Sequence, residues 1–133
     1  MQNLEQIRAR NAFQFGKEGS VSGTDGGEVI KKIPPLIQNH GLLATAAYSF
    51  ADTDKQGWQK VFDAIARHLA DPEIAIVPRE RVKDRRSLLE YLTDKDTPSE
   101  VLRLATNETM AWLTYARRFV SKGDKSAKGG DSE

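Results

Sequence analysis

The spacing of apolar residues predicts helices along most of the chain. Between Leu4 and Lys17, apolar side chains form a broad arc on a helical wheel, with polar side chains opposite. A later stretch has a single apolar stripe made of Trp58, Val61, Phe62, Ile65 and Leu69. The alternation of apolar and polar residues that marks a half-buried strand is absent. We therefore predict an all-α fold, a compact bundle of about five to six helices with no significant sheet.

The best strand candidate is the short run Ile74–Val77, which is closed by Pro78. Asp71-Pro72 ends the helix before it. We interpret this run as an extended linker or a single helical turn. Asp84 is a candidate N-cap for the next helix, which should extend through Leu92 with its leucines facing the core.

The last helix has the clearest start signal in the chain. Thr97 is the predicted N-cap, Pro98 occupies the first helical position, and Glu100 completes a capping box. Apolar and small residues then step by three and four positions to Phe119, which predicts a continuous core seam. We expect this helix to end near Lys122-Gly123.

A polar interruption marks the segment from Ile33 to Tyr48. Two prolines, Pro34 and Pro35, precede an apolar run that is broken by Gln38-Asn39-His40 and Gly41. We predict a helix from Glu28 to about Ile33, an interruption at the prolines, and a further helix to about Ala51. A core helix has no need of three consecutive polar side chains, so Gln38, Asn39 and His40 are a predicted contact surface.

Composition divides the chain into one helical domain and a tail. Residues 16–27 include five glycines in twelve positions, which predicts a flexible loop. This loop lacks the Gly-Lys-Ser/Thr ending of a phosphate-binding loop, and no strand precedes it. Residues 123–133 are rich in Lys, Ser, Gly and Asp and are predicted to be disordered. We expect a single domain over residues 1–122.

The overall charge and composition exclude few functions. The chain has 133 residues, 38% of them hydrophobic, and a formal net charge of +1, so any argument for nucleic-acid binding must come from local patches. It has no cysteine, which excludes disulfides and thiolate chemistry. No apolar run reaches the ~18 residues of a membrane span. We expect a cytoplasmic protein.

No catalytic constellation stands out in the sequence. The two histidines, His40 and His68, form no metal-binding pair, and no Gly-x-Ser-x-Gly motif marks a nucleophile. A ribonuclease using His40 is a weak alternative, because one histidine without an evident acid–base partner is a weak signal for catalysis. We expect no enzymatic activity, no metal and no cofactor.

Basic residues cluster in three places. Five of them lie between Arg79 and Arg86, against only Glu80 and Asp84. Lys31 and Lys32 precede the two prolines, and Arg117 and Arg118 lie on the face of the last helix opposite its seam. Arg8 is unusual because it falls inside an apolar arc, where it either pairs with an acid or contacts a partner. Such groups can neutralise phosphates or simply face solvent.

Three segments resemble the small subunit of the type III-B (Cmr) CRISPR RNA-guided effector complex. They are the first helix at Leu4–Ala12, the segment Lys32–Thr45, and the last helix around Glu108–Phe119 with its Trp-Leu pair and trailing arginines. The segment Lys32–Thr45 is the most specific of the three.

The resemblance implies an all-α, non-catalytic protein whose copies stack into a minor filament beside the larger subunits that carry the CRISPR RNA. It implies that target and DNA cleavage belong to other subunits. Candidate RNA-binding residues are then Arg8, Lys31, Lys32, Arg85, Arg86, Arg117 and Arg118. Gln38, Asn39 and His40 become candidates for contact with a neighbouring subunit or the RNA.

The leading hypothesis from the sequence is a structural subunit of this antiviral ribonucleoprotein that contacts the backbone of the guide–target duplex. Its partners would be other subunits, copies of itself and CRISPR and target RNA. One alternative is a small helical adaptor that binds a protein helix without nucleic acid. Another is the minor ribonuclease based on His40.

Overall fold

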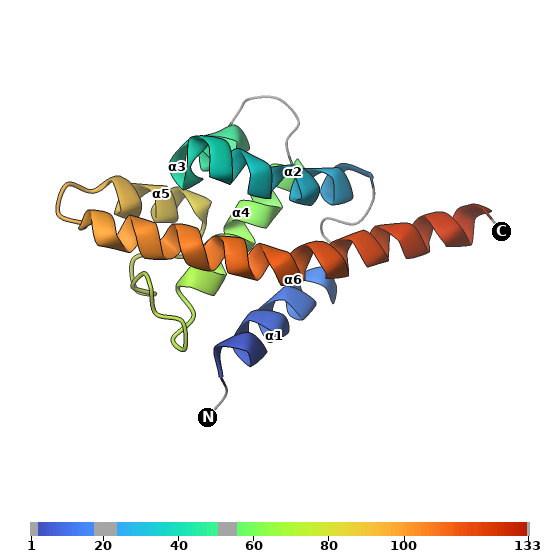
Figure 1. Cartoon of the computed structure of the whole chain (residues 1–133), viewed down its shortest axis with the longest axis horizontal. Helices are drawn as coiled ribbons and strands as arrows, with labels where there is room; N and C mark the ends of the chain where they lie inside the picture. Colours follow the sequence, from blue (N-terminus) through green and yellow to red (C-terminus); the bar gives the residue numbers. More distant parts are fainter. Residues whose placement is uncertain (1–2, 18–23, 51–55, 133) are drawn as a thin grey trace.

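The computed structural model describes residues 3–17, 24–50 and 56–132, and the side chains of residues 3–17, 29–50 and 57–119 (Figure 1). Within these ranges the chain is helical, with no strand, as predicted. The elements are α1 (Leu4–Lys17), α2 (Thr24–His40), α3 (Leu42–Ala47), the 3₁₀ turn η1 (Tyr48–Phe50), α4 (Gln56–Leu69), α5 (Arg85–Thr93) and α6 (Ser99–Ser132).

Helix α6 crosses the whole molecule, and α1, α2 and α4 pack against it (Figure 1). The core lies between these helices. Trp112 of α6, which is almost fully buried, has its ring centroid 5.6 Å from that of Phe15 in α1 and 5.7 Å from that of His68 in α4. One tryptophan therefore joins three helices at the centre of the core, where an aromatic side chain buries the most apolar area.

The predictions for α1, α4 and α5 are confirmed. Helix α1 has the predicted bounds, and the five apolar residues of the α4 stripe are all buried. Asp84 caps α5: its side chain accepts a hydrogen bond from the backbone N–H of Ser87, and the Ser87 hydroxyl accepts one from the backbone N–H of Asp84. The stretch between α4 and Asp84 is irregular, with Ile76 and Val77 donating to the carbonyl of Leu69.

The predicted break at Pro34-Pro35 is wrong, because α2 continues through both prolines. Neither proline can donate a backbone hydrogen bond, so the carbonyls of Ile30 and Lys31 lose their helical donors. The helix persists because Ile30, Ile33 and Ile37 form a buried stripe against the rest of the core. Lys31 and Pro35 are exposed, so water can reach the carbonyl freed there.

The break comes instead at Gly41, between α2 and α3. Its backbone has φ 94° and ψ 163°, a conformation open almost only to glycine. The residue ends α2 and starts α3, whose Thr45 returns a hydrogen bond to the Gly41 carbonyl. The predicted helix to about Ala51 is therefore two short elements, α3 and η1, that end at Phe50.

Both glycine-rich regions contain more helix than predicted. Of the predicted loop at 16–27, Gly16 and Lys17 belong to α1 and residues 24–27 belong to α2, while 18–23 lie outside the described residues. Gly16 permits close packing: a Cβ at this position would lie 2.8 Å from the Cβ of Phe119 in α6. The predicted end of α6 near Lys122-Gly123 is also wrong, since the helix continues to Ser132. No proline follows Gly123, so no residue there lacks the backbone N–H that a helix needs.

The last helix begins where predicted, but its predicted capping box does not form. The backbone N–H of Thr97 donates to the carbonyl of Asp94, and the Thr97 hydroxyl donates to the carbonyl of Tyr91. The Glu100 carboxylate pairs with Arg103 one turn along the helix instead of returning to Thr97. The capping box would have made the Glu100 carboxylate the acceptor for the Thr97 backbone N–H. The carbonyl of Asp94, in the loop after α5, takes that place.

Candidate nucleic-acid interface

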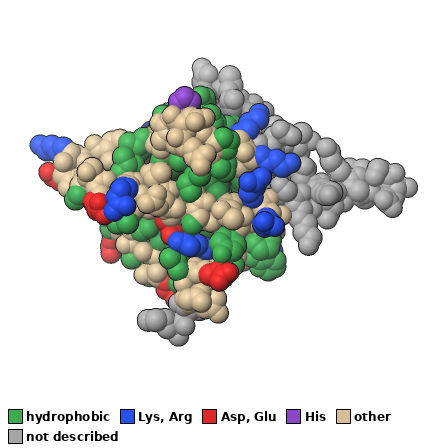
Figure 2. All heavy atoms as spheres, viewed as in Figure 1, with side chains coloured by type: hydrophobic (Ala, Val, Ile, Leu, Met, Phe, Trp, Pro, Cys, Tyr) green, Lys and Arg blue, Asp and Glu red, His purple; other side chains and the backbone are tan. Residues whose placement is uncertain are grey.

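Four of the predicted RNA-binding residues are exposed cations on two helices that pack together. Lys31 and Lys32 follow buried Ile30 in α2, and Arg117 and Arg118 follow buried Ala116 in α6. The buried stripes fix how each helix rotates, so these cations face solvent. Figure 2 shows Lys and Arg side chains gathered where the first half of α2 lies beside α6. We call Lys31, Lys32, Arg117 and Arg118 the α2–α6 basic face.

No acidic partner is described for any of these four cations within the described part of the chain. An exposed cation without a carboxylate partner keeps its full charge available for a phosphate oxygen. The basic face is therefore chemically suited to bind a polyanion.

Arg85 and Arg86 lie elsewhere, in the first turn of α5. Arg85 is held by Asp63 of α4, with its Nη1 3.4 Å from Oδ1 of the carboxylate and its backbone N–H donating to the same oxygen. Arg86 is exposed, and its guanidinium carbon lies 5.2 Å from the centroid of the Phe50 ring. Of this pair, only Arg86 is not committed to an ion pair among the described residues.

Arg8 is one half of an ion pair inside the molecule. Its Nη2 lies 2.7 Å from Oε1 of Glu108, and its Nε donates to Oε2 at 2.8 Å. Of the two interpretations of Arg8 in the apolar arc, pairing with an acid is therefore confirmed. The carboxylate occupies the Nε–Nη2 edge of the guanidinium, an edge that a phosphate could otherwise bind in the same two-pronged way.

Gln38, Asn39 and His40 are all exposed and lie together in the last turn of α2, directly before Gly41. Among the described residues, no acid lies within hydrogen-bond distance of His40. The structure thus keeps all three side chains on the surface, and none of them pairs with a group that would activate the imidazole for catalysis.

A polar network joins α1, α4 and α6, and little in the local sequence pattern pointed to it. The His68 Nε2 lies 2.8 Å from Oε2 of Glu108, and the Asn11 amide lies 2.9 Å from His68 Nδ1 and 3.0 Å from Oδ2 of Asp71. An amide N–H only donates, so Nδ1 accepts and the Nε2–H donates to Glu108. The one available signal was Arg8, a charged residue at an apolar position.

Glu108 is a deeply buried carboxylate, with its side chain 6% exposed. Burial raises its pKa, but hydrogen bonds from Arg8 and His68 oppose that effect and lower the pKa to about 2. Asp71 has a lowered pKa as well, because hydrogen bonds from the Glu73 backbone and from Asn11 outweigh its partial burial. Both carboxylates are therefore ionised across the neutral range, and each is compensated by named donors.

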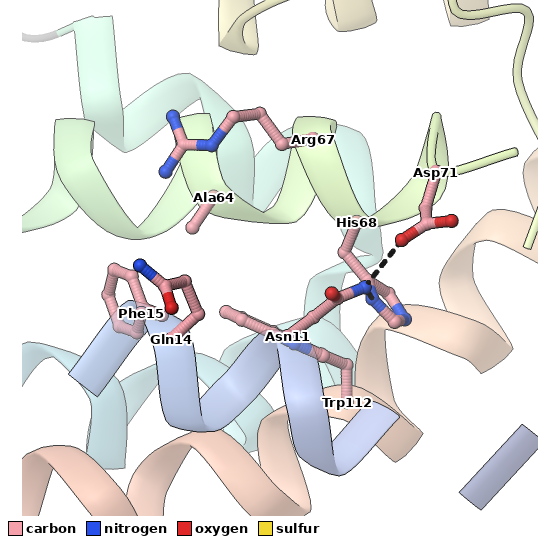
Figure 3. Close-up of a pocket in the computed structure, with 8 residues that line it drawn as sticks. All are labelled: Asn11, Gln14, Phe15, Ala64, Arg67, His68, Asp71 and Trp112. Atoms are coloured by element: carbon pink, nitrogen blue, oxygen red, sulfur yellow. Dashed lines mark hydrogen bonds between the residues drawn. The ribbon is translucent and has the colours of Figure 1, made fainter. Parts of the chain in front are cut away.

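A cavity of about 200 Å³ lies beside this network, between α1 and α4 (Figure 3). It is lined by Asn11, Gln14, Phe15, Ala64, Arg67, His68, Asp71 and Trp112. In the close-up, Asn11 and Gln14 extend from α1 toward α4, with Asn11 joined to Asp71 and His68. The Asn11 amide hydrogens and the His68 nitrogens already have partners in the protein, so this cavity offers few free donors to a ligand.

Comparison with known proteins decides the family. The family model described as CRISPR-associated protein Cas_Cmr5 matches residues 4–122. The chain belongs to the Cmr5 family. No curated protein and no solved structure is significantly similar to it. The Cmr5 match covers every described helix except the end of α6, and it confirms the resemblance to the small subunit of the type III-B complex.

Membership of the Cmr5 family makes the chain a CRISPR-associated subunit, and the family itself is one of small structural subunits. Among the described residues of this Cmr5 protein, no three His, Asp or Glu side chains are placed to hold a metal ion. The described helices also include none that is both long and apolar enough to cross a membrane.

Proposed function

We propose that this Cmr5-family chain is a non-catalytic subunit of a type III-B effector that stacks in the minor filament and contacts the phosphate backbone of the guide–target duplex. The observation behind the RNA contact is the α2–α6 basic face, whose four cations have no acidic partner among the described residues. Family membership supplies the assembly in which such a face would operate.

Backbone contact, rather than base readout, suits this face. Lys and Arg side chains neutralise phosphates whatever the sequence, which a subunit bound to a variable guide requires. Both tryptophans, Trp58 and Trp112, are buried together with Phe62, so these three rings are not available to stack on bases. The duplex would therefore be held through its charge and shape.

The candidates do not contribute equally to this proposal. Arg8 and Arg85 are held by Glu108 and Asp63, so we assign them to the stability of the fold. Arg86 is exposed but lies on α5, which carries none of the four residues of the basic face. The proposed duplex contact therefore rests on Lys31, Lys32, Arg117 and Arg118.

Stacking into a filament needs two different patches, because head-to-tail contacts between copies are heterologous. The exposed run Gln38, Asn39 and His40 is the proposed polar part of one patch. Polar contacts of this kind are wet and weak, so we expect a monomer or weak self-associate when the chain is free. Analytical ultracentrifugation that finds a tight, closed dimer would contradict the stacking model.

Charge removal in the assembled complex tests the RNA contact. Replacing Lys31, Lys32, Arg117 and Arg118 with Gln should weaken target RNA binding without changing complex assembly. A matched variant replaces Arg79, Lys83, Lys95 and Arg103, four other exposed cations, and should bind RNA normally. Equal affinity of both variants would remove the RNA contact, and co-purification with a single protein and no RNA would favour the adaptor alternative.

A further inference from the structure

A second surface feature lies between η1 and α5. It is a hollow of about 500 Å³, within the range of ordinary small-molecule pockets. Its walls are Ala47, Phe50, Arg86, Leu89, Glu90 and Thr93. In Figure 1, α3 and α5 lie at the opposite end of the bundle from the start of α2, so the hollow is separate from the basic face.

One wall of the hollow is a guanidinium group supported by an aromatic ring. Arg85 and Arg86 lie 4.9 and 5.2 Å from the Phe50 centroid, and Asp63 anchors Arg85. Arg86 is exposed and has no carboxylate partner among the described residues. A guanidinium is planar, and a nucleobase can stack on its face.

Beside the Arg86 guanidinium, the hollow offers two acceptor groups, on Glu90 and Thr93. Glu90 follows Arg86 by one helical turn and is exposed, and no ion pair between the two side chains is described. The Thr93 hydroxyl donates to the backbone carbonyl of Leu89, which leaves its oxygen as an acceptor. A carboxylate and a hydroxyl oxygen complement a heterocycle that bears an amino group, as adenine, cytosine and guanine do. Uracil has no amino group and offers only the single N–H of its pairing edge.

We propose that this hollow binds one unpaired RNA nucleobase that bears an exocyclic amino group, stacked on Arg86 and hydrogen-bonded to Glu90. The proposal rests on the proposed RNA contact and adds a base preference to it. An apolar side chain from a protein partner fits the hollow less well, because it would cover Arg86 and Glu90 without giving either charge a partner. A nucleobase gives Arg86 a stacking partner and Glu90 a hydrogen-bond donor.

Binding of short RNA homopolymers to the full-length chain tests this site. Fluorescently labelled oligocytidylate, oligoadenylate and oligouridylate of equal length serve as probes, with fluorescence anisotropy at low salt as the measurement. We expect oligocytidylate or oligoadenylate to bind about tenfold more tightly than oligouridylate, the scale of one stacked and hydrogen-bonded base.

Two variants change the hollow without touching the core. Glu90→Ala should reduce the base preference to less than about twofold, because it removes both oxygens that would accept from the amino group. Ala47→Leu should do the same by filling the hollow, since Ala47 is an exposed helical position. Circular dichroism melts of both variants confirm that they remain folded.

A third variant separates the base site from the backbone contact. Arg117→Gln with Arg118→Gln should weaken the binding of all three probes by the same factor and keep their ratio. Equal affinity for the three probes, no binding to any of them, or a preference that survives Glu90→Ala would overturn the base site. If all three probes bind equally and the binding weakens with salt, the base site is wrong but the proposed backbone contact still stands.

Discussion

Arg8 and Glu108, 100 residues apart, form a two-pronged ion pair between α1 and α6 at 2.7 and 2.8 Å. The carboxylate also accepts a hydrogen bond from His68 of α4. Three helices therefore meet at one buried oxygen pair, next to the stack of His68 on Trp112. This arrangement gives the packing of α1 against α6 a direction and a register that apolar contacts alone do not specify.

Removing either partner of this pair should destabilise the protein. Arg8→Leu leaves the Glu108 carboxylate buried with only the His68 hydrogen bond, and we expect a loss of about 3 kcal/mol in the free energy of unfolding. Glu108→Gln should cost less, because Arg8 is 23% exposed and can turn to water. Urea denaturation measures the free energy of unfolding of both variants. An Arg8→Leu variant as stable as the wild type would contradict the stabilising role of the Arg8–Glu108 ion pair.

The same carboxylate should make stability depend on acid. The pKa of Glu108 is lowered to about 2 from an ordinary value of 4.5, so its contribution is complete above about pH 4.5. That contribution, about 3 kcal/mol, should be lost as the pH falls from 4.5 toward 2. Denaturation across this range should show a shallower pH dependence for Glu108→Gln than for the wild type, and parallel curves would assign the acid sensitivity to other groups.

Gly16→Ala should destabilise the protein although alanine favours helices. The added Cβ would lie 2.8 Å from the Cβ of Phe119, so α1 and α6 must move apart. We expect a net loss of about 1–3 kcal/mol, the usual range for overpacking. Gln14→Ala, an exposed position in the same helix, is the control and should change the melting temperature little. A Gly16→Ala variant more stable than the wild type would show that the contact is not tight.

Gly41 should resist substitution for a different reason. A side chain here meets no atom within 4 Å, so any loss comes from the backbone, whose φ is +94° with ψ 163°. We expect Gly41→Ala to cost about 1–3 kcal/mol in the free energy of unfolding. Gly41→Asn should not recover the loss, because asparagine favours the left-handed helical region rather than this one. A fully stable Gly41→Asn would contradict this assignment.

The parts of the fold that depend on local pattern were predictable from the sequence. The bounds of α1 and the Asp84 cap of α5 follow from periodicity and capping within a few residues. The path of α2 through Pro34 and Pro35 was not predictable, because it depends on Ile30, Ile33 and Ile37 packing into the core. Tertiary contacts there outweigh two missing hydrogen bonds.

The candidate site was also predictable only in part. The sequence identified the basic residues, but not which of them are paired, since Asp63 and Glu108 meet Arg85 and Arg8 only in the folded chain. The role of His68 was missed for the same reason. Its partners, Asn11 and Glu108, lie far away in sequence, and nothing local marks them as a set.

The salt dependence of RNA affinity tests the central claim most directly. Counterion release makes the logarithm of the association constant fall linearly with the logarithm of salt concentration, by about 0.7–0.9 for each phosphate neutralised. Assembled complexes carrying the Gln variant of Lys31, Lys32, Arg117 and Arg118 should therefore show a slope smaller by about 3 for each copy whose basic face contacts RNA. The variant of Arg79, Lys83, Lys95 and Arg103 should keep the wild-type slope. A wild-type slope in the basic-face variant would contradict the account.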